Sequence, residues 1–321
     1  MRTEFICDIC GERAGTLLSS RRYSAARISD ADIYHGKRLR VLFDVWCAGM
    51  PEVTFTAVMC NACGFVSHLP RAESRDVHAK YVALCEWGQD YGRGDTGDFI
   101  EQRSRDLFIA LKPAVTLNSP MNILDFGGGD GRLMSAFSQA GHRTFLVDYN
   151  NSPVDGVQKL SDTLDGLDPG MSFDLIVANY VLEHVAEPTV TLRRLSRHIR
   201  PGGFLFVEVP MEIWGGAPLH DEPVTHVNFF VQGSLRRCFE EAGLEVIFCR
   251  LARTRYSSGI RLSVQALGMR SHNVPRPKAT GARQVKAFLS PSIGHRIRRR
   301  LIIDGGIVST LRHTARRYHA R

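Results

Sequence analysis

The segment NILDFGGGDGRL, residues 122–133, constrains the fold more than any other part of the sequence. Residues 121–126 are mostly apolar and short enough for a buried strand, whereas apolar residues recur at helical spacing from Leu133 to Ala140. The segment therefore predicts a strand, a glycine turn and a helix. A turn without side chains lets a ligand approach the unpaired N–H groups of a helix N-terminus, which favours a nucleotide-like ligand.

The spacing of the glycines distinguishes between nucleotide-binding motifs. A P-loop needs Gly-Lys-Ser/Thr, but Arg132 follows Gly131. The dinucleotide fingerprint G-x-G-x-x-G, started at Gly127, would need a glycine in place of Arg132. The pattern that fits is acid-x-Gly-x-Gly-x-Gly, formed by Asp125, Gly127, Gly129 and Gly131. This pattern resembles the first motif of class I S-adenosylmethionine-dependent methyltransferases, which implies that these residues bind that cofactor; a purely structural glycine turn is the alternative.

A second acidic strand end follows the glycine motif. Residues 144–148 (TFLVD) predict a buried strand that ends at Asp148. In doubly wound sheets an acid at this strand end accepts hydrogen bonds from ribose hydroxyls, so we assign Asp148 that role, with an exposed turn aspartate as the alternative. Tyr149 packs either on the adenine ring or within the fold. Asp162 is the candidate for the adenine amino group, unless it is a solvated turn acid.

The third predicted strand, residues 173–178, leads to Asn179 at its carboxyl end. Ligands of open α/β sheets bind at this edge, so Asn179 joins the cofactor-binding candidates. The passage LEHV at 182–185, the helix after it and the strand FLFVEV resemble the same methyltransferase family in content and order. Two last strands, at 244–249 and 260–267, agree with the seven-stranded sheet of that family.

The resemblance implies an α/β fold with a Rossmann-like class I methyltransferase sheet. Because the chain of 321 residues exceeds a core of this kind, we expect further modules at both ends. The expected division is a zinc-binding ribbon-like module at 1–75, a helical linker at 76–118, the methyltransferase domain at 119–268 and a basic tail at 269–321. The chain has no secretory apolar region at its start and no long apolar stretch, which predicts a soluble, cytoplasmic protein.

Four of the eight cysteines form two matching pairs, Cys7-x-x-Cys10-Gly and Cys60-x-x-Cys63-Gly. Each pair has the spacing of a zinc knuckle, in which two thiolates reach one tetrahedral ion and the glycine permits a tight turn. Two knuckles predict a closed, structural zinc site, and a redox dithiol is the main alternative. The long segment between the pairs is expected to carry structure of its own, including a strand at residues 40–46 (RVLFDVW).

The cysteine pairs, followed by the glycine motif, resemble the zinc-ribbon methyltransferases that act on nucleotide-linked deoxysugars and on other glycan or secondary-metabolite precursors. This resemblance implies a small-molecule acceptor that is methylated at oxygen or carbon. In the sugar C-methyltransferases of this group, a Tyr-His-Glu-His stretch before an aromatic pair supplies the base. Residues 223–226 (PVTH) keep only the last histidine, His226, before the pair Phe229 and Phe230. Methylation at carbon is therefore in question.

Methyl transfer from a sulfonium requires alignment of the acceptor, and a base where the acceptor must lose a proton. We favour His226 as the base, because it precedes the aromatic pair in the loop expected to cover the substrate. Glu183 and His184 after the third strand, and His220 and Asp221, are the other catalytic candidates. Each histidine has a purely structural role as its alternative.

Positive charge is concentrated at the end of the chain, where residues 270–321 hold 13 Lys or Arg and one acid. This basic tail predicts contact with an anionic membrane surface, with another protein or with RNA, unless it is simply solvated. Nucleic acid is the less favoured partner, because no Asn-Pro-Pro-Tyr-like base-reading motif follows the third strand.

Three functions remain open at this point. The favoured one is an S-adenosylmethionine-dependent methyltransferase with a small-molecule acceptor of the sugar or glycan-precursor class. A nucleic-acid methyltransferase is suggested by the zinc knuckles and the basic tail. A non-catalytic scaffold that keeps the cofactor fold is the third.

Overall fold

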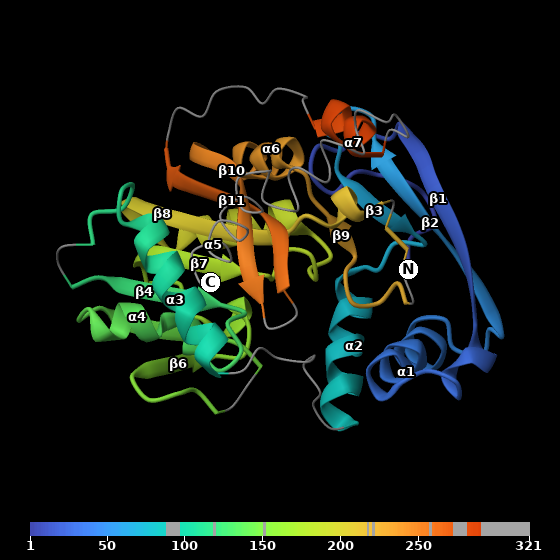
Figure 1. The fold of residues 1–321 in the computed structure, drawn as a ribbon, viewed down its shortest axis with the longest axis horizontal. Coiled ribbons are helices and arrows are strands. Elements are labelled where there is room, and N and C mark those ends of the chain that lie inside the picture. The colour runs from blue at the N-terminus through green and yellow to red at the C-terminus, as the bar shows by residue number, and fades with distance from the viewer. Residues whose placement is uncertain are drawn as a thin grey trace, which may run out of the picture.

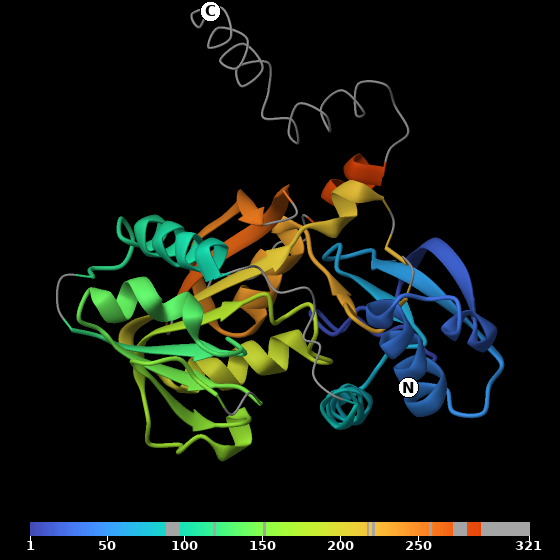
Figure 2. The same ribbon diagram turned by 60° about the horizontal axis from the view of Figure 1, so that its bottom comes forward.

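The computed structural model describes residues 1–87, 97–117, 120–149, 152–216, 218–219, 222–256, 259–271 and 281–289. Its strands form a seven-stranded and a four-stranded sheet, which lie side by side in Figure 1 and Figure 2. The other residues, including the candidates His220 and Asp221 and most of the predicted basic tail, lie outside the described part of the chain.

The larger sheet has the strand order β10-β11-β8-β7-β4-β5-β6. Its strands are β4 (Asn122–Phe126), β5 (Arg143–Val147), β6 (Val157–Ser161), β7 (Phe173–Asn179), β8 (Ile199–Pro210), β10 (Leu244–Tyr256) and β11 (Gly259–Arg270). The strands β4 to β8 pair in parallel, and β11 is antiparallel to both β8 and β10. The predicted α/β fold class is confirmed, and each strand predicted for this sheet is present.

Helices cover both faces of the larger sheet, as Figure 2 shows. One face carries α3 (Gly97–Leu111), η3 (Arg132–Met134) and α4 (Ser135–Gln139), and the other carries α5 (Pro188–Arg197) and α6 (Gln232–Glu241). Alternation along β4 explains the two layers. Ile123 packs in the cluster that contains Leu107 of α3, and Leu124 packs in the cluster that contains Leu192 of α5.

The smaller sheet has the order β1-β2-β3-β9 and is antiparallel throughout. Strands β1 (Gly15–Ser24), β2 (Glu52–Cys60) and β3 (Val66–Leu69) come from the N-terminal region, whereas β9 (Asn228–Phe229) comes from the loop after β8. Val224 and Val227 of the same loop belong to the hydrophobic core beside this sheet. The N-terminal module and the loop that carries His226 therefore pack as one unit.

The prediction of a strand at residues 40–46 is wrong. Helix α1 (Ile33–Arg40) continues directly into a π-helical segment, η2 (Val41–Trp46). The buried side chains of η2 share a core with Tyr23 and Phe55 of the smaller sheet. A short apolar run has the same composition in a buried helix as in a buried strand, so sequence periodicity does not separate the two.

The connecting segments contain most of the remaining structure. The segment 76–118, expected to be a helical linker, contains most of α2 (Ser74–Glu86) and all of α3. Between β5 and β7 the described residues form only β6 and a 3-10 turn, η4 (Leu164–Gly166). Two further 3-10 turns are η1 (Ala25–Ile28) and η5 (Glu212–Gly215).

Helix α7 (Gly281–Leu289) belongs to the predicted basic tail. A Cβ added to Gly64 would lie 2.1 Å from the carbonyl carbon of Gly281, and a Cβ on Gly281 would lie 2.0 Å from the carbonyl oxygen of Cys63. The start of α7 is therefore in backbone contact with the second cysteine turn. Among the described residues, no helix has both the length and the apolar content of a membrane span.

Candidate active site

The glycine motif forms a tight turn between β4 and η3. Gly127, Gly129 and Gly131 have φ angles of 70°, 65° and 81°, in the left-handed region that favours glycine. A Cβ on Gly128 would lie 1.9 Å from Oδ2 of Asp125, whereas a Cβ on Gly129 would meet no atom within 4 Å. The turn is thus filled on the side of Asp125 and open at Gly129, where a ligand can approach the backbone.

Asp125 supplies a buried carboxylate at this turn. Its side chain is fully buried, and neither carboxylate oxygen has a hydrogen-bond partner among the described residues. Burial, followed by the charges of Asp148 and Asp130, raises the pKa of Asp125 to about 8. A buried carboxylate without a partner is costly, so this position suits a ligand that brings a cationic or hydrogen-bond donor group. The amino group of S-adenosylmethionine is such a group.

Asp148 lies directly after β5 and close to the glycine turn. Its Oδ2 accepts a hydrogen bond from the Gly129 N–H at 2.9 Å, so the two predicted cofactor motifs meet. The neighbouring Tyr149 ring stacks on Tyr81 of α2, with the centroids 5.7 Å apart and the planes 21° apart. Burial raises the pKa of the Tyr149 phenol. Asp162 is exposed and pairs with Lys159.

Asn179 lies at the carboxyl end of β7, beside a pocket of about 420 Å³ that is also lined by Leu133 of η3. With its amide group oriented to satisfy its neighbours, Asn179 accepts a hydrogen bond from Arg103 Nη2 at 2.9 Å and donates one to Glu208 Oε2 at 3.2 Å. The Arg103 guanidinium also lies 5.2 Å from the centre of the Tyr180 ring. Helix α3 thus brings a positive charge to the edge of the sheet that holds the glycine turn.

The four predicted zinc ligands come together in the N-terminal module. Sγ of Cys7 lies 3.5 Å from Sγ of Cys63, and Sγ of Cys10 lies 3.5 Å from Sγ of Cys60. All four sulfur atoms lie within 4.8 Å of one another. Zinc–sulfur bonds of about 2.3 Å in a tetrahedron place sulfur atoms roughly 3.8 Å apart, so the cluster fits a zinc ion.

The turns of the cysteine pairs have the geometry of zinc knuckles. Gly11 and Gly64 both have φ of 74°, and their N–H groups donate to the carbonyls of Cys7 and Cys60 at 2.9 and 3.0 Å. The Cys63 N–H points to Sγ of Cys60 at 3.5 Å, as expected for an amide that supports a metal-bound thiolate. Four thiolates would fill the tetrahedral coordination of a zinc ion and leave no open position for catalysis, and three of the four cysteines are buried.

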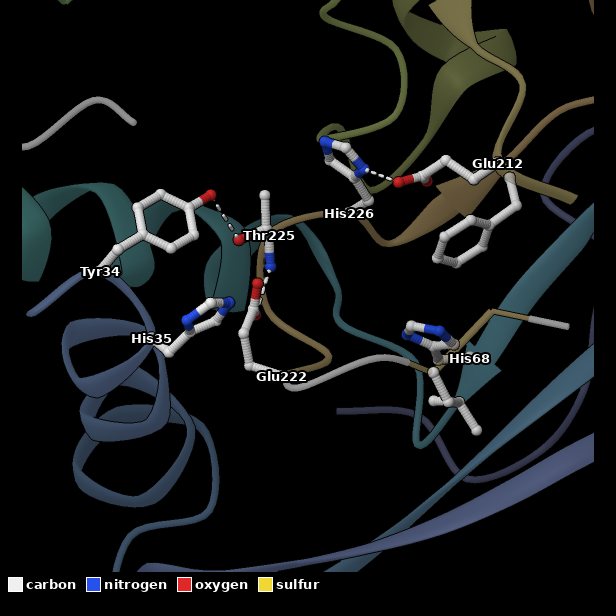
Figure 3. A pocket seen from close by; sticks show the side chains of 9 residues that line it. Tyr34, His35, His68, Glu212, Glu222, Thr225 and His226 are labelled. Carbon is white, nitrogen blue, oxygen red and sulfur yellow. Dashed lines mark hydrogen bonds and ion pairs between the residues drawn. The ribbon is translucent and has the colours of Figure 1, made fainter. Parts of the chain in front are cut away.

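The predicted base His226 is part of a cluster of ionisable groups. Its Nδ1 donates a hydrogen bond to Oε1 of Glu212 at 2.9 Å (Figure 3). Its ring meets that of His184 edge to face, with the centroids 4.8 Å apart. His184 in turn donates from Nδ1 to the Thr225 carbonyl at 2.7 Å, and its Nε2 lies 3.8 Å from Oε1 of Glu183. The three predicted catalytic residues therefore lie together.

The members of this cluster have pKa values shifted in different directions. Burial alone would lower the pKa of His226, but the adjacent Glu212 carboxylate outweighs it and raises the pKa to about 9. Burial, followed by the charges of His226 and Lys80, lowers the pKa of His184. Burial also raises the pKa of Glu183 to about 8. At neutral pH, His226 is thus cationic and His184 neutral.

A polar pocket of about 180 Å³ lies against His226. Figure 3 shows its walls, which come from α1, from β3 and from the segment around η5 and β9. The lining residues are Tyr34, His35, His68, Glu212, Leu219, Glu222, Thr225, His226 and Phe229. The pocket is smaller than the roughly 300–1,000 Å³ of typical ligand pockets, so it suits a compact and polar molecule.

The pocket and the glycine turn are connected through the end of β7. A Cβ on Gly127 would lie 2.7 Å from Cγ2 of Val181, so Val181 packs directly on the turn. Glu183 and His184 follow Val181 after one intervening residue. The Glu183 carbonyl accepts hydrogen bonds from the N–H groups of Val227 and Asn228, which fix the loop that carries His226.

Arg71 links the cysteine site to this loop. Its buried guanidinium donates to the carbonyl oxygens of Val227 at 2.5 Å and Ala186 at 2.6 Å, and to Oδ1 of Asn228 at 2.6 Å. Its Nε forms an ion pair with Asp8, within the first cysteine turn, at 2.9 Å. The zinc knuckle, Arg71 and the backbone beside His226 therefore form one continuous set of contacts.

Sequence reasoning missed several residues that line the two pockets, or that lie buried near them, through long-range packing. They include Tyr34, His68, Arg71, Lys80, Arg103, Glu212 and Glu222. The buried Lys80 donates to the Val224 carbonyl at 3.2 Å, and burial lowers its pKa to about 8. One local signal pointed to Arg71. Its partner Asp8 lies between Cys7 and Cys10, where a zinc knuckle does not require an acidic residue.

Comparisons with known proteins find matches to part of the chain. Residues 99–247 match a family described as a methyltransferase domain. A ubiquinone biosynthesis O-methyltransferase from Bradyrhizobium diazoefficiens is 28% identical over 105 residues, which cover 29% of this chain and 42% of that protein. A tRNA 5-carboxymethoxyuridine methyltransferase from Escherichia coli is 30% identical over 101 residues, which cover 26% of this chain and 38% of that protein.

The chain thus spans about two fifths of the length of these two curated relatives. Among solved structures, the 1,6-didemethyltoxoflavin-N1-methyltransferase of Burkholderia thailandensis is similar, with 18% identity and a TM-score of 0.49. That similarity covers 68% of this chain and 96% of the other chain.

Proposed function

Because residues 99–247 belong to the methyltransferase domain family, we propose that this chain methylates a small, hydroxyl-bearing acceptor with S-adenosylmethionine as the methyl donor. The acceptor class that we propose is a sugar or glycan precursor, and the acceptor atom is oxygen. The observation that carries the proposal is the compact polar pocket beside His226, at the same sheet edge as the glycine turn.

We assign the cofactor to the turn formed by Gly127, Gly129 and Gly131. The partnerless Asp125 carboxylate suits the amino group of the methionine moiety, and Arg103 suits its carboxylate. Asp148 is placed to accept hydrogen bonds from the ribose hydroxyls, and Tyr149 and Asn179 complete the set of cofactor contacts that we propose. The cofactor supplies an electrophilic methyl group on a sulfonium, so the protein mainly aligns the acceptor.

The acceptor belongs in the 180 Å³ pocket, because its walls offer the hydrogen-bonding groups that hydroxyls require. Thr225 and Tyr34 present hydroxyls, and Glu212 and Glu222 present carboxylates. We assign removal of the acceptor proton to the neutral form of His226, which becomes available as the pH approaches its raised pKa of about 9, with Glu183 and His184 beside it. Since Nδ1 of His226 donates to Glu212, its Nε2 is the nitrogen that faces this task.

A phosphate backbone fits this pocket poorly. Nucleic-acid binding depends on Lys and Arg side chains that neutralise phosphates, whereas this pocket is bordered by two glutamates. The name of one relative, an O-methyltransferase, supports oxygen as the acceptor atom, and the name of another, a tRNA methyltransferase, keeps RNA as the alternative to be tested.

The test combines cofactor binding with methyl transfer. The full chain is titrated with S-adenosylhomocysteine by calorimetry, with Asp148→Asn as the variant and Asp168→Asn as the matched exposed control. We expect Asp148→Asn alone to weaken binding, by about tenfold or more, since hydrogen bonds to charged groups contribute about 1.5–3 kcal/mol. Labelled S-adenosylmethionine is then offered with nucleotide-linked sugars or with tRNA. Methyl transfer to tRNA alone would replace the small-molecule proposal with an RNA methyltransferase. If the wild type did not bind S-adenosylhomocysteine, the non-catalytic scaffold would be the remaining function.

A further inference from the structure

The predicted catalytic residues form a second group of potential metal ligands, separate from the four cysteines. One ligand atom from each of Glu183, His184 and His226 lies within 4.8 Å of the others. In the described part of the chain, this group and the cysteine cluster are the two that meet this geometry. Two histidines and one carboxylate are a ligand set that first-row transition metals accept.

The hydrogen bonds of the two histidines orient both rings for a metal. His184 must carry its proton on Nδ1, because the Thr225 carbonyl at 2.7 Å can only accept. His226 likewise donates from Nδ1 to Glu212 at 2.9 Å. The Nε2 atom of His184 is thereby left for a further ligand, and that of His226 becomes available when metal binding displaces its second proton. Metal-bound histidines almost always donate their other N–H to a carboxylate or a backbone carbonyl, and these two residues show one example of each.

Glu183 supplies the charge that a cation would neutralise. The residue is 1% exposed, and neither carboxylate oxygen has a hydrogen-bond partner among the described residues. Its Oε1 lies 3.8 Å from Nε2 of His184, which is beyond hydrogen-bond distance. An isolated buried carboxylate is unfavourable, and a bound divalent ion removes that penalty.

We propose that Glu183, His184 and His226 bind a divalent first-row transition-metal ion. Metal–nitrogen and metal–oxygen bonds of about 2.0–2.2 Å require the three side chains to close in by small rotations. Three protein ligands leave coordination positions open for an acceptor, and His226 is the ligand that also lines the pocket. Glu212 and the Thr225 carbonyl then act as positioning groups behind the two histidines.

The role of the ion, but not its binding, rests on the proposed function. An acceptor hydroxyl bound to the ion would release its proton to solvent water more readily, because the ion would stabilise the resulting negative oxygen. His226 is then a metal ligand instead of the proton acceptor. The two accounts of the same cluster differ in one measurable respect, which is whether a second metal ion is bound.

The test is uptake of Co²⁺ by the full chain with zinc already in its cysteine site. We expect the wild type to bind one equivalent of Co²⁺ with the weak visible bands of nitrogen and oxygen ligands. Thiolate-to-cobalt charge-transfer bands would instead report exchange at the cysteines. Glu183→Gln keeps the shape of the side chain and removes a buried charge, so it should fold. It should bind Co²⁺ at least about 100-fold more weakly, and Glu212→Gln should lose about 10–100-fold.

His35→Gln is the matched control, because His35 lines the pocket without belonging to the ligand group. It should bind Co²⁺ as the wild type does. Wild-type protein that takes up no cobalt, or Glu183→Gln protein that takes up as much as the wild type, would overturn the inference. Cobalt uptake without methyl transfer to any acceptor would leave the metal site standing and remove the proposed function. Methyl transfer by protein that binds no second metal would overturn the metal site and leave the proposed function standing.

Discussion

The glycine turn at residues 125–131 is formed by one short stretch of chain, whereas the pocket around His226 takes its walls from α1, β3 and the segment after β8. The turn depends on backbone conformation, on the buried Asp125 and on the half-buried Asp148. The pocket depends on how the N-terminal module is docked, through β9 and Arg71. A change in the N-terminal module should therefore damage acceptor recognition while cofactor binding survives, and a change in the turn should do the opposite.

The largest expected effect is loss of the zinc site. Cys60→Ser should remove the structural ion, whose binding contributes on the order of 10 kcal/mol to folding in small zinc modules. The pocket walls would then lose their support, and a displacement of about 1 Å is enough to lower turnover roughly 100-fold. Affinity for S-adenosylhomocysteine should change by less than about tenfold, since the glycine turn keeps its own contacts.

The measurements are metal content, turnover and calorimetric affinity. Cys85→Ser is the control, because Cys85 is exposed and outside the cysteine cluster. A parallel fall of turnover and cofactor affinity in Cys60→Ser would show that the two regions are not separable.

Arg71→Met should have the next largest effect. It removes one of the two arginine partners of Asp8, the other being Arg2, and leaves the carbonyl oxygens of Val227 and Ala186 without this donor. Breaking a buried ion pair from one side costs about 3–5 kcal/mol, which denaturant unfolding can measure. Because Arg22 pairs with Glu52 on the surface, Arg22→Met should cost less than about 1 kcal/mol.

Arg71→Lys keeps the charge but loses the planar group that contacts several acceptors. We expect a folded protein with a raised KM for the acceptor and an unchanged affinity for S-adenosylhomocysteine. An unchanged KM for the acceptor in Arg71→Lys would contradict the proposed coupling between the cysteine turn and the pocket.

A pair of glycine substitutions tests whether the glycine turn is the cofactor site. Gly129 and Gly141 both have positive φ, of 65° and 87°, and both would place a Cβ in open space. Each change to alanine should cost about 1–2 kcal/mol of stability, because a side chain disfavours this conformation. Only Gly129→Ala should also weaken S-adenosylhomocysteine binding, because only there does the Cβ occupy the proposed ligand space. Equal calorimetric affinities for the two variants would argue against the assigned cofactor position.

The last effect concerns the pH dependence of stability conferred by Asp125. Its pKa rises from the usual carboxylate range to about 8 on folding, so the folded protein holds a proton that the unfolded chain releases. Stability of the ligand-free protein should therefore fall as pH rises from about 4 to 8, and Asp125→Asn should lack this component. Thermal unfolding at pH 5 and pH 8 measures the difference, with Asp162→Asn as the exposed control. Asp125→Asn should also bind S-adenosylhomocysteine more weakly than the wild type.

The same contrast explains what the sequence predicted. The glycine turn, the strands around it and the four cysteines depend on residues that are close in sequence or on rigid spacing, and the structure brings each of these sets together. The family match over residues 99–247 confirms the methyltransferase resemblance. The roles assigned to individual cofactor and catalytic residues stay predictions.

The sequence did not reveal how the N-terminal module meets the pocket. Tyr34, His68 and Arg71 become pocket or linking residues only because β9 pairs with β3, a contact between segments about 160 residues apart. The helix at residues 40–46 was mistaken for a strand for a related reason, since an apolar run does not encode what it packs against. Local patterns therefore predicted the cofactor side, and tertiary contacts determined the acceptor side.

The position of β9 has a consequence for synthesis of the chain. Three strands of the smaller sheet emerge from the ribosome early, but Asn228 and Phe229 follow only after most of the larger sheet has been made. Until then Arg71 lacks its carbonyl partners and β3 presents an unpaired edge, which is a feature that promotes association with other chains. The N-terminal module thus completes its folding late, once the loop after β8 has been made, and separating the two parts at residue 75 would leave β3 without its partner β9.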